Sequence, residues 1–327
     1  MNERRVTGGV LMLVGAVALP VLHQRATGIW TWDIPGLAHS PVGGTAAAKW
    51  IFAAMALGFA VKVPLVPLHN WLPDAHTEAP AAGSVMLAGV MLKMGVYGFF
   101  RILVPVFPEL SAQALPCLGA LGVVNILYGA LCAMAQTDLK RLVAFTSISH
   151  LGFCMVGLFS LTAAGLSGSA LQLVNHGLST GGLFLLVGMM YGRAHRRGLA
   201  DFGGLAATAP WFAFFFGFVL LSSIGLPGLN GFVGEFLSLA GLAKVSGRLA
   251  AAALLGTALA AAYGLPAYQK VFWAPAGPAS ASGRISDMNR RERLIFWALS
   301  ALIVGLGICP GPFMRFLALS TSGLVMR

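Results

Sequence analysis

Long apolar runs recur along the whole chain and are separated by short polar stretches. The runs cover residues 6–22, 46–68, 80–100, 112–135, 143–162, 166–191, 207–243, 249–273 and 294–316. Most of them are close to the roughly 20 residues that an α-helix needs to cross a bilayer. The pattern predicts an all-α, polytopic membrane helix bundle of about nine transmembrane helices, forming a single transmembrane domain over residues 1–327.

Two of the runs contain residues that interrupt a helix. The run 46–68 has two prolines directly after Lys62, and proline lacks the N–H that continues a helix. The run 207–243 is too long for one straight helix, and the sequence GLPGLNG near its middle precedes Glu235. Broken backbone at membrane depth is tolerated only inside protein or along a hydrated cavity. The breaks are expected at Pro64, Pro67, Pro227 and Gly228.

Composition excludes several classes of protein. Hydrophobic residues make up 57% of the chain, charged residues only 9%, and the mean hydropathy is +0.82, so the chain cannot form a soluble surface. The net charge of +11 resembles that of a nucleic-acid-binding protein, but nearly all of the basic residues fall in loops at the ends of the runs. No nucleotide-binding motif occurs, and the four scattered cysteines form no CxxC pair. The sequence therefore indicates a membrane protein without a cofactor of its own and without a nucleic-acid partner.

The distribution of basic residues predicts the orientation of the chain. Nine alternating passes place 12 Lys and Arg on one side and 7 on the other, with two lysines inside the membrane. Basic residues favour the cytoplasmic side. The N-terminus and the loop 274–293 are therefore expected in the cytoplasm and the C-terminus in the periplasm. The run 6–22 is interpreted as an uncleaved first span rather than a signal peptide.

Three charged residues stand apart because they lie inside apolar runs: Lys62, Lys93 and Glu235. A lysine in hydrocarbon costs roughly 3 kcal/mol, so such residues face the protein interior and commonly mark ion or proton paths. The alternative is that each lysine is only the structural partner of a carboxylate. We favour proton transfer, because two of the three charges adjoin expected helix breaks.

Histidines add further candidates. His150 and His176 lie in the runs between Lys93 and Glu235, and each is either a proton relay or a satisfied core residue, since a histidine ring can accept and release protons near neutral pH. After the first break, a loop contains His69, Asp74 and His76. This loop either bonds the broken helix and feeds protons to it or is simply a structured connection.

Several segments resemble a known family. They are KVPLVPLHNWLPDAHTEAPAAGSVMLAGVMLKMGVYG, QTDLKRLVAFTSISHLGF, NHGLSTGGLFLLVGMMYGRAH and LLSSIGLPGLNGFVGEF. They are similar to the antiporter-like subunits of proton-pumping NADH:quinone oxidoreductase, respiratory complex I. The form PLHxWLPDAHxxAP followed by AGSV resembles the subunit M branch, the bacterial counterpart of mitochondrial chain 4. The resemblance extends from about residue 25 to 310.

The resemblance implies a role for each candidate. Lys62 matches the lysine of the family's first broken helix, Lys93 a bridging lysine, and Glu235 the acid of the second broken helix, with His150 and His176 between them. Protons would move along these groups, driven by quinone reduction elsewhere in the complex. NADH, FMN, iron–sulfur clusters and quinone would be bound by partner subunits, and the chain would lie beside other membrane subunits in the bacterial inner membrane.

The family pattern also implies a difference in length. Its members have fourteen helices, and this chain is expected to begin at the sixth, so that it lacks the first five helices and the glutamate that pairs with the lysine at Lys62. Either a separate polypeptide supplies those helices or the sequence is a fragment.

Two other functions are consistent with the same residues. One is a subunit of a multisubunit Na⁺/H⁺ antiporter or a membrane-bound hydrogenase, which Na⁺-dependent pH changes in vesicles would favour. The other is a structural membrane subunit that does not conduct protons. Neutral substitutions at Lys62, Lys93 and Glu235 that leave activity intact would favour this structural role.

Overall fold

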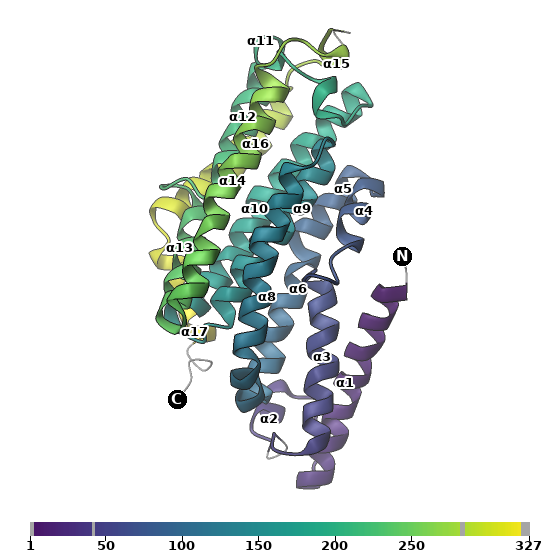
Figure 1. The fold of residues 1–327 in the computed structure, drawn as a ribbon, viewed down its shortest axis with the longest axis vertical. Coiled ribbons are helices and arrows are strands. Elements are labelled where there is room, and N and C mark those ends of the chain that lie inside the picture. Colours follow the sequence, from purple (N-terminus) through teal and green to yellow (C-terminus); the bar gives the residue numbers. More distant parts are fainter. Residues whose placement is uncertain (1–2, 41–42, 282–284, 322–327) are drawn as a thin grey trace.

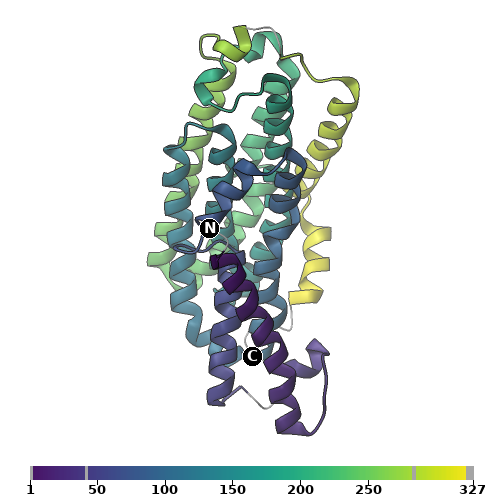
Figure 2. The ribbon, with the colours of Figure 1, turned by 90° about the vertical axis from the view of Figure 1, so that its right-hand side faces the viewer.

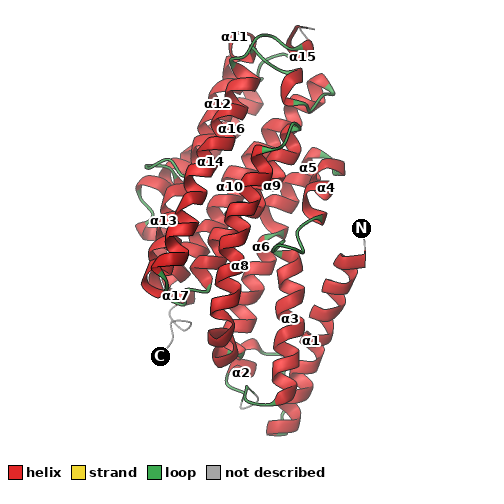
Figure 3. Ribbon diagram, viewed as in Figure 1, coloured by secondary structure: helices red, strands yellow, loops and turns green. Residues whose placement is uncertain are grey.

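The computed structural model describes residues 3–40, 43–281 and 285–321. In this part of the chain the helices pack side by side along the long axis of the molecule, and no strand is present (Figures 1 and 3). The predicted all-α class is confirmed. Both chain ends and Arg284, which were used to predict the orientation, lie outside the described residues.

The long helices follow the predicted apolar runs. They are α1 (Glu3–Thr27), α3 (Ala46–Lys62), α8 (Pro108–Met134), α9 (Leu139–Leu158), α10 (Ala163–Ala194), α12 (Pro210–Ser223), α13 (Asn230–Val245), α14 (Gly247–Phe272), α16 (Arg290–Ile308) and α17 (Gly311–Thr321). Short helices connect them: α2 (Ile34–Ala38), α4 (Trp71–Glu78), η3 (Leu199–Asp201), α11 (Leu205–Thr208) and α15 (Pro278–Ala281).

One further span alternates between two helix types. It consists of α5 (Ala81–Met86), η1 (Leu87–Met91), α6 (Lys93–Gly98), η2 (Phe99–Leu103) and α7 (Val104–Val106), where η1 and η2 are π-helical. The apolar pattern does not reveal these wider turns, which are commonly found at functional sites.

The nine predicted runs are all helical, but they are not nine uninterrupted spans. Among the described residues, six helices are long and apolar enough to cross a membrane, and α16 with α17 forms a seventh span if this pair, bent by 80°, is counted once. Both predicted breaks are present: within run 46–68 the helix α3 ends at Lys62 and a non-helical segment follows, and run 207–243 is divided into α12 and α13. The bend between α16 and α17 was not predicted; it lies at Cys309 and Pro310.

Helix α9 forms the centre of the bundle, and nearly every residue along it is buried. Glycines bring it very close to α8. A Cβ atom on Gly129 would lie 2.7 Å from the amide nitrogen of Ser149, and one on Gly152 would lie 2.7 Å from the carbonyl oxygen of Gly122. The backbones of α8 and α9 are therefore in direct contact. On one side of the bundle α1 packs along α3 (Figure 2).

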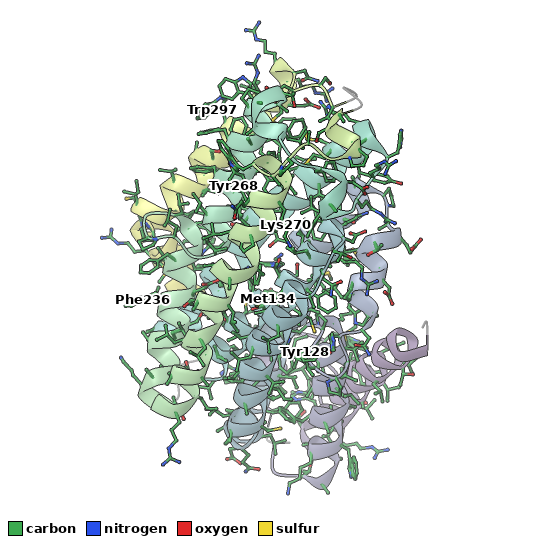
Figure 4. The ribbon with its side chains drawn as sticks, turned by 45° about the horizontal axis from the view of Figure 1, so that its top comes forward. Tyr128, Met134, Phe236, Tyr268, Lys270 and Trp297 are labelled. Carbon is green, nitrogen blue, oxygen red and sulfur yellow. The ribbon has the colours of Figure 1, made fainter. Side chains whose placement is uncertain are left out.

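Exposed tryptophans mark both ends of the bundle. Trp30, Trp32 and Trp50 surround the end where α1 finishes and α3 begins, and Trp273 and Trp297 lie where α14 finishes and α16 begins. Figure 4 shows Trp297 at the edge of the bundle. Tryptophan is enriched at the two interfaces between membrane and water. The two groups therefore agree with a bundle whose long axis crosses the membrane.

Candidate functional site

Four of the predicted site residues meet at the centre of the bundle, although they come from four different helices. Lys93 begins α6, His176 lies on α10, His150 on α9 and Glu235 on α13. His150, His176 and Glu235 are each at most 3% exposed. Their contacts follow the order Lys93, His176, His150, Glu235.

The first contact joins Lys93 to His176. Lys93 Nζ lies 2.7 Å from His176 Nδ1, and it also donates to the carbonyl of Ala88. Ala88 lies in the π-helical turn η1, where the amide of Leu92 bonds the carbonyl of Leu87 instead of that of Ala88. An ammonium group only donates, so a charged Lys93 requires Nδ1 of His176 to accept.

The two histidines line the same very small polar cavity. Their ring centroids are 5.8 Å apart. The cavity has a volume of about 10 Å³ and is also lined by Ser179, Thr180 and Ser223. A polar space of this size has room for about one water molecule.

His150 is hydrogen-bonded at both ring nitrogens. Its Nδ1 lies 3.0 Å from Glu235 Oε1, and its Nε2 lies 3.0 Å from Ser223 Oγ and 3.5 Å from the hydroxyl of Tyr263. Gln172 Nε2 donates to the same oxygen of Glu235 at 3.3 Å. A ring with partners on both nitrogens can accept a proton on one side and release it on the other.

The second helix break lies directly against Glu235. The chain leaves α12 and enters α13 through a turn that contains Pro227, with Gly225 at φ +78° and Gly228 at φ +91°. A Cβ atom on Gly225 would lie 2.9 Å from Glu235 Oε2. Glycine is therefore needed at this position for two reasons, its positive φ and the close approach of the carboxylate.

Polar side chains tie this break to α10. Asn175 Nδ2 donates to the backbone carbonyl of Asn230 at 2.7 Å. Ser222 Oγ donates to Asn230 Oδ1 at 2.5 Å, and Ser179 Oγ lies 2.6 Å from Ser222 Oγ. Side chains of α10 and α12 thus hold the first residue of α13 in place beside the break.

Lys62 lies apart from the four residues Lys93, His176, His150 and Glu235. It is the last residue of α3, is partly buried, and lines a cavity of about 440 Å³ together with Trp71 of α4 and residues of α1 and α5. The end of α3 packs against α6, because a Cβ atom on Gly95 would lie 3.0 Å from Lys62 Cβ. The structure therefore places Lys62 beside the helix that carries Lys93, with its side chain at the cavity.

The segment after the first break contains Pro64 and Pro67 and carries His69. The indole of Trp71 donates to the carbonyl of Val61 at 2.9 Å. His69 is buried, and its ring meets Tyr128 edge to face at 5.0 Å; Figure 4 labels this tyrosine.

The short helix α4 is bound by basic residues. Asp74 pairs with Arg141 at 3.0 Å, and Lys140 Nζ donates to the carbonyl of Ala79 at 2.5 Å. His76 is fully buried, and its ring stacks on Phe184 at 4.3 Å. The Asp74 pair is more than a third exposed on each side, so its contribution is at most about 1 kcal/mol. These contacts agree with a structured connection, the simpler of the two interpretations of this loop.

Several polar residues of the site were not singled out from the sequence. They are Asn125, Gln172, Ser222, Ser223 and Tyr263. Each is a polar position within an apolar run, which is a detectable signal, but the sequence does not show which of these positions meet. Within the described residues no group of three or more His, Cys, Asp and Glu side chains is arranged to hold a metal ion.

Comparison with known proteins places the chain in one family. The family described as NADH:quinone oxidoreductase/Mrp antiporter, transmembrane, matches residues 6–260. NADH-quinone oxidoreductase subunit M of Escherichia coli K12 is 39% identical over 306 residues, which cover 94% of this chain and 60% of that protein. The chain thus spans about 60% of the length of such curated relatives.

Solved structures agree with this relationship. A chain of respiratory complex I from Thermus thermophilus with bound NADH has a TM-score of 0.88 and 38% identity, covering 98% of this chain and 68% of that one. The Mrp complex from Dietzia sp. DQ12-45-1b contains a chain of the same fold, with a TM-score of 0.86 and 22% identity, covering 99% of this chain and 67% of that one. The chain therefore belongs to the NADH:quinone oxidoreductase/Mrp antiporter transmembrane family.

Proposed function

We propose that this chain is a membrane subunit of a proton-translocating NADH:quinone oxidoreductase and carries protons through its buried Lys, His and Glu residues. The observation that supports this function best is the succession of buried groups from Lys93 to Glu235: Lys93 contacts His176, His150 contacts Glu235, and the two histidine rings lie 5.8 Å apart, centroid to centroid. All four side chains exchange protons, and an uncompensated charge in such a buried place is costly unless it has a partner or a function.

The order of contacts gives a sequence of proton transfers. Lys93 donates its proton to His176 Nδ1 along the 2.7 Å contact. His176 passes a proton from its other nitrogen across the small polar cavity to His150. His150 then releases a proton to Glu235 Oε1 through Nδ1. In each step the acceptor is a neutral ring nitrogen or a carboxylate, as proton transfer requires.

Lys62 is the proposed supplier of protons to Lys93, the first of these four residues. Its position at the helix break, beside the backbone of α6, suits a group that passes protons to Lys93. His69 and His76 lie in the segment that follows the break, and His69 is the nearer of the two to it in sequence.

Energy for the transport would come from outside this chain. We infer that partner subunits bind NADH, FMN, iron–sulfur clusters and quinone. Quinone reduction in those subunits changes the charge on the row of residues from Lys93 to Glu235. Neighbouring antiporter-like subunits would be the direct membrane partners.

Vesicles containing the intact complex test this function against the antiporter alternative. We expect NADH oxidation by quinone to drive proton uptake into inverted vesicles, with the same initial rate in Na⁺ and in K⁺ buffers. Proton movement that requires Na⁺ and proceeds without electron transfer would contradict the proposal and favour a Na⁺/H⁺ antiporter. Proton uptake is followed with a pH-sensitive dye. Vesicles treated with a protonophore, which cannot hold a proton gradient, show how much of the dye signal is unrelated to proton uptake.

We further propose that the chain lies in the bacterial inner membrane with the end that carries α11 and α15 in the cytoplasm. Basic residues favour the cytoplasmic side, and two basic loops, before α9 and after α10, lie together at this end. The amide of Leu139 donates to the carbonyl of Arg197 at 2.9 Å. Arg193 also pairs with Glu292 at 2.8 Å, which brings the start of α16 to the same end.

Cysteine labelling tests the orientation. In a chain without its native cysteines, a membrane-impermeant maleimide is expected to label His39→Cys in intact spheroplasts and Ala276→Cys only in inverted vesicles. Both positions are exposed, and they adjoin α2 and α15, which lie at opposite ends of the bundle (Figure 1). Labelling of Ala276→Cys from the periplasm would reverse the proposed topology.

A further inference from the structure

A buried asparagine binds the backbone of the first helix break. Asn125, on α8, is completely buried. The amide of Val66 donates to Asn125 Oδ1 at 2.7 Å, and Asn125 Nδ2 donates to the carbonyl of Pro64 at 3.1 Å. One side chain therefore supplies both an acceptor and a donor to the backbone that follows Lys62. A buried backbone group without a partner costs about 1–3 kcal/mol.

The same side chain also reaches the helix that carries His150. Asn125 Nδ2 lies 3.5 Å from the carbonyl of Ile148, at the limit of a hydrogen bond. One residue further along each helix, Ser149 Oγ donates to the carbonyl of Ile126 at 2.9 Å. Asn125 thus stands where the α8–α9 pair meets the broken segment.

A buried side-chain amide also meets the backbone at the second break. There Asn175 of α10 donates to the backbone carbonyl of Asn230, the first residue of α13, at 2.7 Å. In both places the amide comes from a neighbouring helix, but only Asn125 binds the non-helical segment itself, through one donor and one acceptor. The double contact favours a positioning role for Asn125 over an accidental one.

We propose that Asn125 is a positioning residue for proton transfer at Lys62: it holds the interrupted backbone in a fixed place relative to α9 and His150. This inference rests on the proposed proton-transport function. Because Lys62 directly precedes the segment that Asn125 binds, displacement of that segment changes the distance from Lys62 to its proton partners. Proton transfer depends steeply on such distances.

The chemistry of the amide suggests a diagnostic substitution. In Asn125→Asp, the neutral acid accepts a hydrogen bond from Val66 and donates one to Pro64, as the amide does. The carboxylate only accepts and places a negative charge against the Pro64 carbonyl. The variant should therefore keep the break in place at low pH and lose it at high pH. Asn125→Leu fills a similar volume and removes both hydrogen bonds.

The experiment measures NADH-driven proton uptake in inverted vesicles between about pH 6 and pH 9, the range over which a buried carboxyl group titrates. Rates are normalised to the amount of assembled complex. At the acid end of this range, we expect the proton-uptake rate of Asn125→Asp to be within about twofold of the wild-type rate. At the alkaline end, we expect it to be about tenfold below the wild-type rate at the same pH. Asn125→Leu is expected to be about tenfold low at every pH, a loss equivalent to about 1.4 kcal/mol in a barrier.

A residue on the same helix provides the matched control. Ser111 of α8 is equally buried and donates to the carbonyl of Leu103 at 3.3 Å, away from the break. Ser111→Ala should keep the wild-type rate and pH profile. If Asn125→Leu does not assemble, the pH profile of Asn125→Asp decides the question.

Two results would overturn the inference. One is an Asn125→Asp profile parallel to that of wild type, and the other is an assembled Asn125→Asp complex that is equally inactive at all pH values. Failure of the proposed function itself is recognised separately: proton uptake at the wild-type rate in Lys93→Met would reject the transport route, whatever the Asn125 variants do.

Discussion

Replacing Lys93 with methionine is expected to reduce proton transport by about tenfold or more, equivalent to at least about 1.4 kcal/mol in the barrier, while the complex still assembles. Methionine keeps most of the apolar stem and removes the ammonium group that contacts His176 Nδ1 and the carbonyl of Ala88. His176 then has no proton donor on the Lys93 side. The measurement is NADH-driven proton uptake in inverted vesicles, normalised to assembled complex.

Lys93→Arg is the companion variant. It keeps the positive charge but does not deprotonate in proteins, so it should also be impaired. Loss of transport in both variants identifies proton release, rather than charge, as the necessary property of Lys93. Wild-type uptake by assembled Lys93→Met would instead favour a structural role for this residue and for the chain.

Replacing Glu235 with glutamine is the second substitution with a large expected effect. Glutamine has nearly the same shape and can still accept from the His150 ring, but it neither carries the negative charge nor titrates. We expect proton uptake to fall about tenfold or more. Because the side-chain volume is unchanged, the content of assembled complex should remain close to that of wild type.

Glu235→Asp provides the control for charge. Its carboxylate is one methylene shorter, so contact with His150 Nδ1 is weakened while titration is retained. We expect an intermediate rate, above that of Glu235→Gln. Equal rates for the two variants would show that hydrogen-bond geometry rather than protonation limits the step at Glu235.

Much of the candidate site was predictable because charge is so rare in the spans. Lys93 and Glu235 stand out in apolar runs, and His150 and His176 lie in the runs between them. The order of their contacts was not predictable from periodicity, since the residues that meet are as much as 85 positions apart. That order depends on how four helices pack.

The fold was predictable to a similar extent. Proline and glycine identified the two breaks, since these residues change the backbone locally. The bend between α16 and α17 has the same kind of signal, Pro310, Gly311 and Pro312, and could have been predicted from it. The π-helical turn before Lys93 has no such local signal, because it depends on what the helix packs against. Asn125 was missed for another reason: its partners are backbone groups, which leave no mark of their own in a sequence.

The burial of α9 has a consequence for hydrogen–deuterium exchange. Its backbone amides lie at the centre of the bundle, between neighbours that touch it through glycine backbone. Such amides exchange only when a large part of the protein opens. We therefore expect α9 to be the most slowly exchanging helix during turnover as well as at rest. Helix α9 would then act as a fixed frame of reference, and movement during transport would be confined to side chains and to the broken segments around it.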